Sequence, residues 1–447
     1  MPICSLHPLP YRADPCGYFA RVRFAQGAVL LDSGRPTADR GRFDLLSAWP
    51  LDTLQPVANE SGPVFLQRLR ESLARLGEAD LPEHCALPFA GGLIGYLAYD
   101  FGRLFEPLPD QAIDDLHLPS ARLGLYAWAL VSDHQEQTSQ LVFHPALAHA
   151  ERQHLIALFE HPAAQADISF KLTAPFASDI NAGQYRQAIE RIHAYIQAGD
   201  CYQVNFAQRF RACFEGDPWT AYQALRVACP TPFAGYLALP KGDAVLSLSP
   251  ERFVKVSQRQ VETRPIKGTR PRGRNSAEDA AFADELLASE KDRAENLMIV
   301  DLLRNDLGRT CRIGSVKVPE LFRLESYPNV HHLVSAITGE LAEGKDALDL
   351  IGGGFPGGSI TGAPKIRAMQ IIEELEPTRR ALYCGSLMYL DVRGEMDSSI
   401  AIRSLLAKDG QIACWGGGGI VADSQWEAEY QETFTKVRVL MQTLERL

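Results

Sequence analysis

The segment QIACWGGGGIVADSQWEAEYQETFTKVRVLMQTLERL, residues 411–447, carries the clearest secondary-structure signals of the chain. Residues 411–421 form an apolar, glycine-rich run that predicts a buried strand, and residues 425–446 predict a closing helix. Strand-like runs such as 383–390 and helix-like spacings alternate along the rest of the chain. Because strands and helices are mixed throughout, the sequence predicts an α/β or α+β fold.

The composition is that of a large globular protein. The chain has 447 residues, 46% of them hydrophobic, which suits about two or three domain-sized units or one large one. A net charge of −10 makes the chain a poor binder of nucleic acid or of an anionic membrane. No run approaches the roughly 18–20 apolar residues of a membrane span, and the N-terminus lacks a secretory signal pattern. Nine scattered cysteines without a CxxC pair argue against a zinc ribbon or disulfide framework and fit a cytoplasmic location.

A stretch rich in proline, alanine and serine at 159–181 is the best candidate linker. It separates an N-terminal region, 1–160, from a C-terminal region, 182–447, in which the patterns are sharper. In the C-terminal region the sequence predicts three features besides the closing strand and helix: a loop over 264–274, a long helix over about 277–307, and a glycine-rich loop over 352–362.

Five cations and no acid lie within RPIKGTRPRGR, residues 264–274. A solvated basic loop is the simpler interpretation of this run. The alternative is an anion site with a reactive amine, because a lysine is a nucleophile only when neutral and nearby guanidinium groups would lower its pKa. Lys267 is the single lysine among four arginines and is therefore the candidate nucleophile.

Two acidic couples lie on predicted helices. Asp292 and Glu295 are three residues apart, as are Glu429 and Glu432, so each couple shares one helical face. Such pairs are usually only solvated. If the two couples converge, however, their carboxylates suit Mg²⁺, which prefers oxygen ligands and keeps positions for water and substrate.

The glycine-rich segment GGGFPGGSITGAPK, residues 352–365, runs into a predicted helix, so its backbone N–H groups could hold an anion such as a carboxylate. It is not a phosphate-binding P-loop, because Pro364 and Ile366 stand where glycine and Ser/Thr belong.

Single residues add weaker signals. Glu251 ends a strand-like run and could be a simple turn carboxylate. One of His331 and His332 should face inward from a strand, and an inward histidine is more often only hydrogen-bonded than catalytic. Arg403 interrupts what the sequence predicts as an apolar strand, so it needs a partner or an anionic ligand. The backbone of Gly416–Gly419 could also approach that ligand.

Taken together, these segments resemble the chorismate-utilising enzymes, a family that includes anthranilate, isochorismate and salicylate synthases and the enzymes that aminate C4 of chorismate. Loose matches at LLDSG (30–34) and RFD (42–44) precede a dense series over about 200–447, in family order: AGDCYQVNFAQRF, SLSPERF, RPIKGTRPRG, EKDRAENLMIVDLLRNDLG, NVHHLVS, FPGGSITGAPKIRAMQIIEELE and GGGGIVADSQWEAEYQETFTK. The resemblance implies an α+β fold, a large two-sheet α/β sandwich with helices outside, in which regions 1–160 and 182–447 are intertwined in one globular unit.

Two positions indicate the branch of this family. Members that act at C2 carry alanine where this chain has Lys267, and a lysine there resembles the members that aminate C4. Water-using members carry a lysine base where this chain has Gln203, and an amide cannot deprotonate water near neutral pH. The resemblance therefore implies conversion of chorismate and ammonia to 4-amino-4-deoxychorismate, for 4-aminobenzoate and folate biosynthesis. Anthranilate formation and a non-catalytic, tryptophan-binding relative stay open as alternatives.

The resemblance also implies roles for matching residues. Lys267 would attack C2 while the C4 hydroxyl leaves, protonated by Glu251, and ammonia would then add at C4 and expel the lysine. His332 matches the family's ring-facing histidine. Mg²⁺ would be held by Glu295 and Glu432, supported by Asp292 and Glu429. The expected substrate-binding residues are Gln203, Ser359, Thr361, Tyr383, Arg403, Gly419 and Lys436.

Two partners follow from the resemblance. None of the nine cysteines lies in the Gly-x-Cys-x-Gly elbow of a glutaminase, so a separate glutamine amidotransferase subunit would supply the ammonia. Tryptophan would occupy a pocket that is a feedback site in anthranilate synthases. The residues matching that pocket are Ser33, Arg40, Gly41, Arg42, Phe43, Pro232, Phe233 and Ala234.

Overall fold

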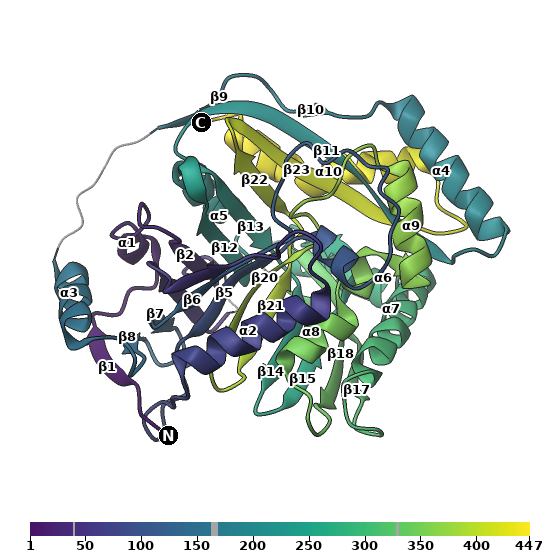
Figure 1. Cartoon of the computed structure of the whole chain (residues 1–447). Coiled ribbons are helices and arrows are strands. Elements are labelled where there is room, and N and C mark those ends of the chain that lie inside the picture. Colours follow the sequence, from purple (N-terminus) through teal and green to yellow (C-terminus); the bar gives the residue numbers. More distant parts are fainter. Residues whose placement is uncertain (39–40, 162–168, 328–329) are drawn as a thin grey trace.

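The computed structural model of the chain describes residues 1–38, 41–161, 169–327 and 330–447. Two large antiparallel sheets lie at the centre of the molecule and helices cover them from outside (Figure 1). The predicted α+β, two-sheet architecture is thus confirmed. In the ranges described, no helix is both long and apolar enough to cross a membrane.

The first sheet has thirteen strands in the described ranges. Its order is β1 (Ser5–Leu9), β8 (Thr138–Phe143), β7 (Trp128–Asp133), β3 (Phe43–Ser47), β2 (Val29–Asp32), β12 (Phe233–Ala238), β13 (Ala244–Ser249), β22 (Ser404–Lys408), β23 (Gln411–Ile420), β11 (Gln203–Gly216) and β10 (Ala177–Ser178), and β11 also pairs with β9 (Phe170–Leu172) and β19 (Gly362–Ala363).

The second sheet has ten strands in the same ranges. Its order is β16 (Ile266–Pro271), β18 (Val330–Glu340), β15 (Gln260–Thr263), β14 (Arg252–Ser257), β21 (Met396–Ile400), β20 (Ser386–Asp391), β5 (Gly92–Leu97), β6 (Ala121–Tyr126) and β4 (Asp52–Leu54), and β17 (Lys317–Ser326) pairs with β18.

Both sheets contain strands from the two halves of the chain, which meet at one junction in each sheet. In the first sheet, β2 pairs with β12, and in the second, β5 pairs with β20. Every residue of β5 is buried, as its apolar sequence GLIGYL requires of a strand covered on both faces. The main hydrophobic core accordingly draws its buried residues from both halves of the chain.

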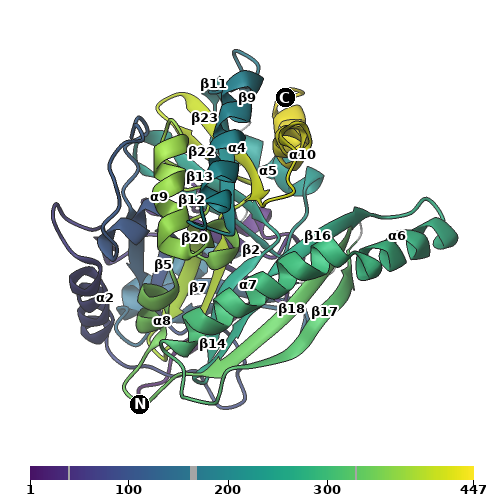
Figure 2. The ribbon, with the colours of Figure 1, turned by 90° about the vertical axis from the view of Figure 1, so that its right-hand side faces the viewer.

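The helices lie outside the sheets. On the first sheet, α9 (Lys365–Leu375) lies against β11 and α10 (Trp426–Leu444) against β23. Beside α10 lie α5 (Pro218–Ala228), which also contacts β12 and β13, and α4 (Ala182–Gln197). Figure 2 shows α7 (Glu290–Gly308) lying across β16 and β18 of the second sheet, with α6 (Ser276–Ala288) beside it. The remaining helical segments are α1 (Cys16–Phe19), α2 (Gly62–Leu76), α3 (His149–Glu160), α8 (Ala347–Gly354), η1 (Tyr99–Leu104), η2 (Pro240–Gly242) and η3 (Gly358–Ile360).

Three local predictions were wrong. The basic run 264–274 is not a loop, because β16 pairs with β18 through most of it. The predicted helix 277–307 is two helices, since Ser289 adopts an extended conformation, ends α6 and caps α7 by accepting from the N–H of Asp292. Residues 352–354 close α8 rather than opening a loop. In each case tertiary contacts outweigh the local pattern.

Candidate functional site

Lys267 lies on β16, at the point where α7 crosses the strand. The next residue, Gly268, has φ +77° and interrupts the pairing of β16 with β18. A Cβ atom there would stand 2.8 Å from Leu286 Cδ1 and 3.0 Å from Asp292 Cβ. Only glycine tolerates both this conformation and this close approach, so Gly268 allows α6 and α7 to pack directly against β16, the strand that contains Lys267.

The electrostatic surroundings of Lys267 favour a neutral amine. Burial and the charge of Lys436 lower the pKa of Lys267, while Glu295, Glu251 and Glu432 oppose that shift. The neighbouring arginines, to which we attributed the shift from sequence, are not among the main influences on the pKa of Lys267. Their guanidinium groups are ion-paired: Arg264 with Glu320 and Glu325, Arg270 with Glu285 and Asp292, and Arg272 with Asp279.

Glu251 lies in the short connection between β13 and β14 and is 5% exposed. It accepts hydrogen bonds from Ser359 Oγ at 3.3 Å and from the N–H of Ile266, next to Lys267. Burial raises the pKa of Glu251 to about 7, although the charge of Lys267 acts in the opposite direction. A carboxylic acid with this pKa can give up or take back a proton near neutral pH.

Both histidines of the pair are buried in β18, not one as predicted. His331 is 2% exposed and bonds to Asp279 of α6 and to Ser326, so its role is to hold that helix. His332 faces the other way and bonds to Thr269 Oγ1 at 2.9 Å. Burial and the charge of Arg403 lower the pKa of His332 to about 4, so its imidazole is neutral at pH 7.

The two acidic couples face one another from α7 and α10. Burial raises the pKa of Glu295, and the charges of Asp292 and Glu429 raise it further, so these carboxylates lie close together. Glu432 is 2.6 Å from Lys436 Nζ, and that ion pair outweighs burial and lowers the pKa of Glu432.

The donors of this acidic group are chemically right for Mg²⁺ but are partly shared with cations. Asp292 is 3.1 Å from Arg270 and Glu432 is paired with Lys436. Among the residues that the structure describes, no three His, Cys, Asp or Glu side chains form a ready metal-binding group. Hard oxygen donors on two facing helices fit Mg²⁺ in kind, and Glu295, whose ion-pair partner Lys291 is 4.0 Å away, is less tightly paired than Glu432.

The glycine run of β23 lies against α10. A Cβ atom on Gly418 would stand 3.3 Å from Glu429 Oε2 and 3.4 Å from Glu432 Oε1. Lys436 Nζ donates to the Gly417 carbonyl at 2.8 Å. The absence of side chains therefore lets the backbone next to Gly419 approach the acidic group and any ligand held there.

Tyr383 and Arg403 lie on two linked turns beside this run. Tyr383 is buried and stacks on Trp415, with ring centroids 6.0 Å apart and planes 5° from parallel. Arg403 does not interrupt a strand as predicted, since it occupies a left-handed turn at φ +49° between β21 and β22. In the described part of the chain its guanidinium group has no carboxylate within ion-pair distance, which suits an anionic ligand.

Three further predicted substrate residues are buried. Ser359 donates to Glu251, as described above, and Thr361 Oγ1 donates to the Gly357 carbonyl at 3.0 Å. Gln203 lies against Gly419, since a Cβ atom there would stand 2.9 Å from Gln203 Cδ. Gln203 thus belongs to the same group of residues as Tyr383 and the glycine run.

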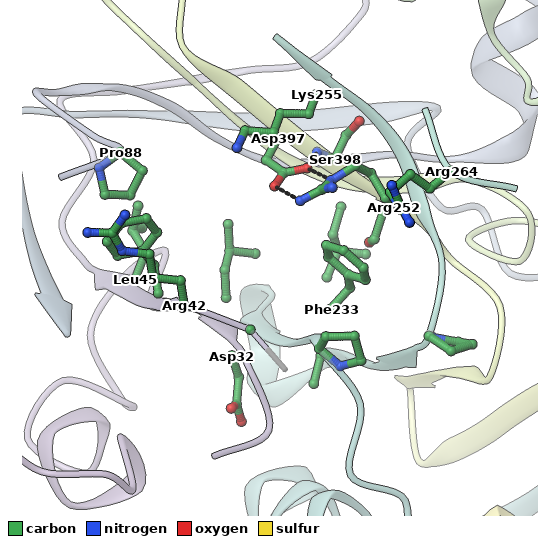
Figure 3. Close-up of a pocket in the computed structure, with 18 of the residues that line it drawn as sticks. Asp32, Arg42, Leu45, Pro88, Phe233, Arg252, Lys255, Arg264, Asp397 and Ser398 are labelled. Carbon is green, nitrogen blue, oxygen red and sulfur yellow. Dashed lines mark hydrogen bonds and ion pairs between the residues drawn. The ribbon is translucent and has the colours of Figure 1, made fainter. Parts of the chain in front are cut away.

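A cavity of about 460 Å³ lies between the two sheets, and Lys267 is not one of the residues that line it. Figure 3 shows Phe233 and Leu45 on its walls and Arg252 paired with Asp397. Five predicted tryptophan residues besides Phe233 also line it: Gly41, Arg42, Phe43, Pro232 and Ala234. Ser33 does not line it, because its hydroxyl bonds to Asp44 at 2.7 Å, and Arg40 lies outside the described residues.

Some residues of the site escaped the sequence analysis. Asn205 is buried near Gly419 within an apolar run, where only its polarity could have drawn attention. Trp415 supports Tyr383, and Lys255 and Asp397 line the cavity. No local pattern marks such residues, because their neighbours in space come from distant parts of the chain.

Comparison with known proteins agrees with this geometry. The model of the chorismate binding enzyme family matches residues 28–442. The chain therefore belongs to the family of chorismate binding enzymes, and the resemblance inferred from its motifs is confirmed.

Individual relatives refine this picture. The chain is 49% identical to aminodeoxychorismate synthase component 1 of Escherichia coli (strain K12), over 96% of each chain. It is 39% identical to anthranilate synthase component 1 of Mycolicibacterium smegmatis, over 93% of this chain and 82% of that protein. Among solved structures, anthranilate synthase component I of Streptococcus pneumoniae TIGR4 superposes with a TM-score of 0.79 at 30% identity, covering 90% of this chain and 92% of that one.

Proposed function

We propose that this chain aminates chorismate at C4, giving 4-amino-4-deoxychorismate. The observation that carries the proposal is that a partly buried amine of lowered pKa, Lys267, lies within electrostatic reach of a buried acid, Glu251, whose pKa is raised to about 7. The similarity to aminodeoxychorismate synthase component 1 over nearly the whole chain supports the same reaction. The experiment is incubation with chorismate, Mg²⁺ and an ammonium salt, followed by identification of the product. Anthranilate as the product would contradict the proposal.

The first half of the reaction uses the two protonation states that the site favours. The lone pair of neutral Lys267 Nζ forms a bond to C2 of chorismate, the two conjugated ring double bonds shift to C1–C6 and C5–C4, and the C4–O bond breaks. The leaving hydroxyl takes the proton of Glu251 and departs as water, which leaves Glu251 ionised and the lysine nitrogen positively charged.

The second half reverses these charges. The lone pair of ammonia forms a bond to C4, and the C2–Nζ bond breaks with its electron pair returning to Lys267. The new ammonium group at C4 then returns a proton to Glu251. Both residues end in their starting states, and chorismate plus ammonia has become 4-amino-4-deoxychorismate plus water.

The remaining residues would bind and orient the substrate. Arg403, Tyr383 and the backbone N–H of Gly419 would hold the enolpyruvyl carboxylate, with Lys436 beside them, and Ser359 and Thr361 would border the ring. His332, being neutral, could only donate or accept a hydrogen bond at the ring. Glu295 and Glu432, supported by Asp292 and Glu429, would hold Mg²⁺, which supplies charge neutralisation for the ring carboxylate when bound.

The metal assignment predicts a binding defect. In the variant Glu432→Gln, Mg²⁺ affinity measured by calorimetry is expected to fall at least about tenfold, because one charged oxygen ligand is lost. Asp301→Asn is a matched control, since Asp301 is an exposed acid of α7 that, among the described residues, pairs only with Arg304. Unchanged Mg²⁺ affinity in Glu432→Gln would show that α10 does not contribute to the metal site.

Ammonia would come from a separate glutamine amidotransferase. This is supported by the absence of a glutaminase elbow from the sequence and by the designation "component 1" of the similar bacterial enzymes. The lysine intermediate needs no partner, so an ammonium salt can replace the second subunit in a test.

The cavity between the sheets would hold tryptophan as a structural ligand. Its walls offer an apolar surface at Phe233 and Leu45 for an indole ring and an amine at Lys255. No carboxylate lies within ion-pair distance of Lys255 in the part of the chain that the structure covers, so it could receive the ligand's carboxylate.

The tryptophan assignment predicts a thermal shift. L-tryptophan at about a hundred times its Kd is expected to stabilise the fold by about 2.7 kcal/mol and so to raise Tm by a few degrees. Ser399→Leu should abolish this shift, because Ser399 shares the face of β21 that carries Asp397 and the added side chain projects into the cavity. L-alanine, which lacks the indole ring, is the control ligand. An equal shift in Ser399→Leu would place tryptophan elsewhere.

A further inference from the structure

Arg380, in the connection between α9 and β20, is the largest fully buried side chain in the part of the chain that the structure describes. A guanidinium group can be buried only if a carboxylate neutralises its charge and its N–H groups are bonded. Glu376, which caps the C-terminus of α9, supplies the carboxylate, and its oxygens accept from Arg380 Nε at 2.9 Å and from Nη2 at 2.6 Å. The same carboxylate accepts from the N–H of Ala207 on β11 at 2.9 Å, so the pair is attached to that strand.

Two further N–H groups of Arg380 bind the backbone of segments that carry proposed substrate-binding residues. Nη1 donates to the Ile360 carbonyl at 3.0 Å, and Nη2 donates to the Asn205 carbonyl at 2.5 Å. Ile360 stands between two of the residues expected to border the substrate ring, and Asn205 pairs with Gly419 across β11 and β23. Four of the five N–H groups of the guanidinium are thus bonded inside the protein.

The same guanidinium group also contacts two tyrosine rings. Its central carbon, Cζ, lies 5.6 Å from the centroid of the Tyr383 ring and 4.7 Å from the centroid of the Tyr99 ring. The N–H of Tyr383 donates to the Arg380 carbonyl at 2.9 Å. Since Tyr383 is a proposed substrate-binding residue, Arg380 contacts a third segment of the site. Only arginine can make all these contacts at once, because its planar fork of donors is fixed, whereas a lysine ammonium group is a compact point charge.

We propose that Arg380 is a positioning residue for chorismate binding. Together with Glu376 it fixes Tyr383, the segment around Ile360 and the start of β11 relative to one another, in the arrangement that the substrate requires. Arg380 is 1% exposed and its donors are occupied, so it acts through these segments rather than by touching the substrate. This inference rests on the proposed function, which supplies chorismate as the ligand.

The test measures chorismate binding by calorimetry in the full chain, with Mg²⁺ present and in the Lys267→Ala background, where no adduct can form. Arg380→Lys keeps a positive charge beside Glu376 but loses the fork of donors. We expect the Kd for chorismate to rise at least about tenfold, because the segments that hold the ligand lose their fixed places. If circular dichroism shows that Arg380→Lys is unfolded, the double variant Arg380→Met/Glu376→Met, which leaves no unpaired charge in the core, should show the same rise.

A second readout uses the chain with Lys267 intact. In Arg380→Lys, formation of the Lys267 adduct should still decline above about pH 7, because Arg380 is not among the main influences on the pKa of Glu251. A defect in positioning therefore changes the affinity for chorismate and leaves this pH profile in place. A changed pH profile would assign Arg380 a part in the chemistry of Glu251 and would contradict a role in positioning alone.

Arg23→Lys, made in the same background, is the matched control. Arg23 is also buried, pairs with Asp217 at the N-cap of α5 and lies over the ring of Phe24, in none of the segments of the proposed site. This variant should lower Tm as Arg380→Lys does but leave the Kd for chorismate within about twofold. A Kd in Arg380→Lys within about twofold of the background value would overturn the inference, and so would an equal rise in Arg23→Lys, which would indicate a general loosening of the fold. If the parent chain bound chorismate but formed no C4 amine, the proposed function alone would fail.

Discussion

Replacing Lys267 with alanine is expected to reduce the formation of 4-amino-4-deoxychorismate at least about a thousandfold. The reason is covalent: without the amine, nothing forms the bond at C2 that expels the C4 hydroxyl. The measurement is the rate of product formation with chorismate, Mg²⁺ and an ammonium salt, followed by chromatography. Binding of chorismate should persist, because Arg403, Tyr383 and the glycine run are untouched.

Lys408→Ala is a suitable control for this variant. Lys408 lies at the end of β22 and pairs with the exposed Asp409, away from the site, so its loss should not change the rate. If Lys267→Ala kept even a tenth of the parent rate, the covalent role of Lys267 would be wrong, and ammonia would have to attack C4 directly.

The second large effect is expected at Glu251. Glu251→Gln should slow formation of the Lys267 adduct by about a hundredfold to ten-thousandfold, because an amide cannot protonate the leaving hydroxyl. The parent rate of this step should fall as pH rises above about 7, where Glu251 loses its proton. In Glu251→Gln that decline should be absent. A decline that survived the substitution would assign it to another group.

The same residue predicts a change in stability with pH. Burial raises the pKa of Glu251 from an ordinary value of 4.5 to about 7, so the folded state binds the proton more tightly than the unfolded state. The free energy of unfolding should therefore fall as pH rises from about 4.5 to about 7, by about 3 kcal/mol for this group, and then level off. Glu251→Gln stays neutral and should lose this dependence, as denaturant titrations at several pH values would show.

The fold was largely predictable because the motifs that contain the candidate catalytic and binding residues also mark the strands and helices on which those residues lie. The apolar, glycine-rich run before the last helix became β23, and 425–446 became α10 with nearly the expected bounds. The errors lie where pairing partners are distant in sequence. Residues 264–274 look like a basic loop, yet β18, more than sixty residues further on at its start, turns most of them into a strand.

The candidate site was predictable in its residue types but not in its electrostatics. The sequence suggested that guanidinium groups lower the pKa of Lys267, whereas in the structure those arginines are neutralised by acids and burial has the larger effect. The contacts of Arg380 could not be foreseen either, because its partner Asn205 is 175 residues away in the sequence.

Intact-protein mass spectrometry after incubation with chorismate and Mg²⁺, without ammonia, tests the central claim most directly. The account predicts a protein heavier by the mass of chorismate less one water, with the addition mapped by peptide analysis to Lys267 and lost when an ammonium salt is added. Parent protein that turned over chorismate to the C4 amine while showing no addition at Lys267, even when quenched within one turnover, would contradict the covalent mechanism.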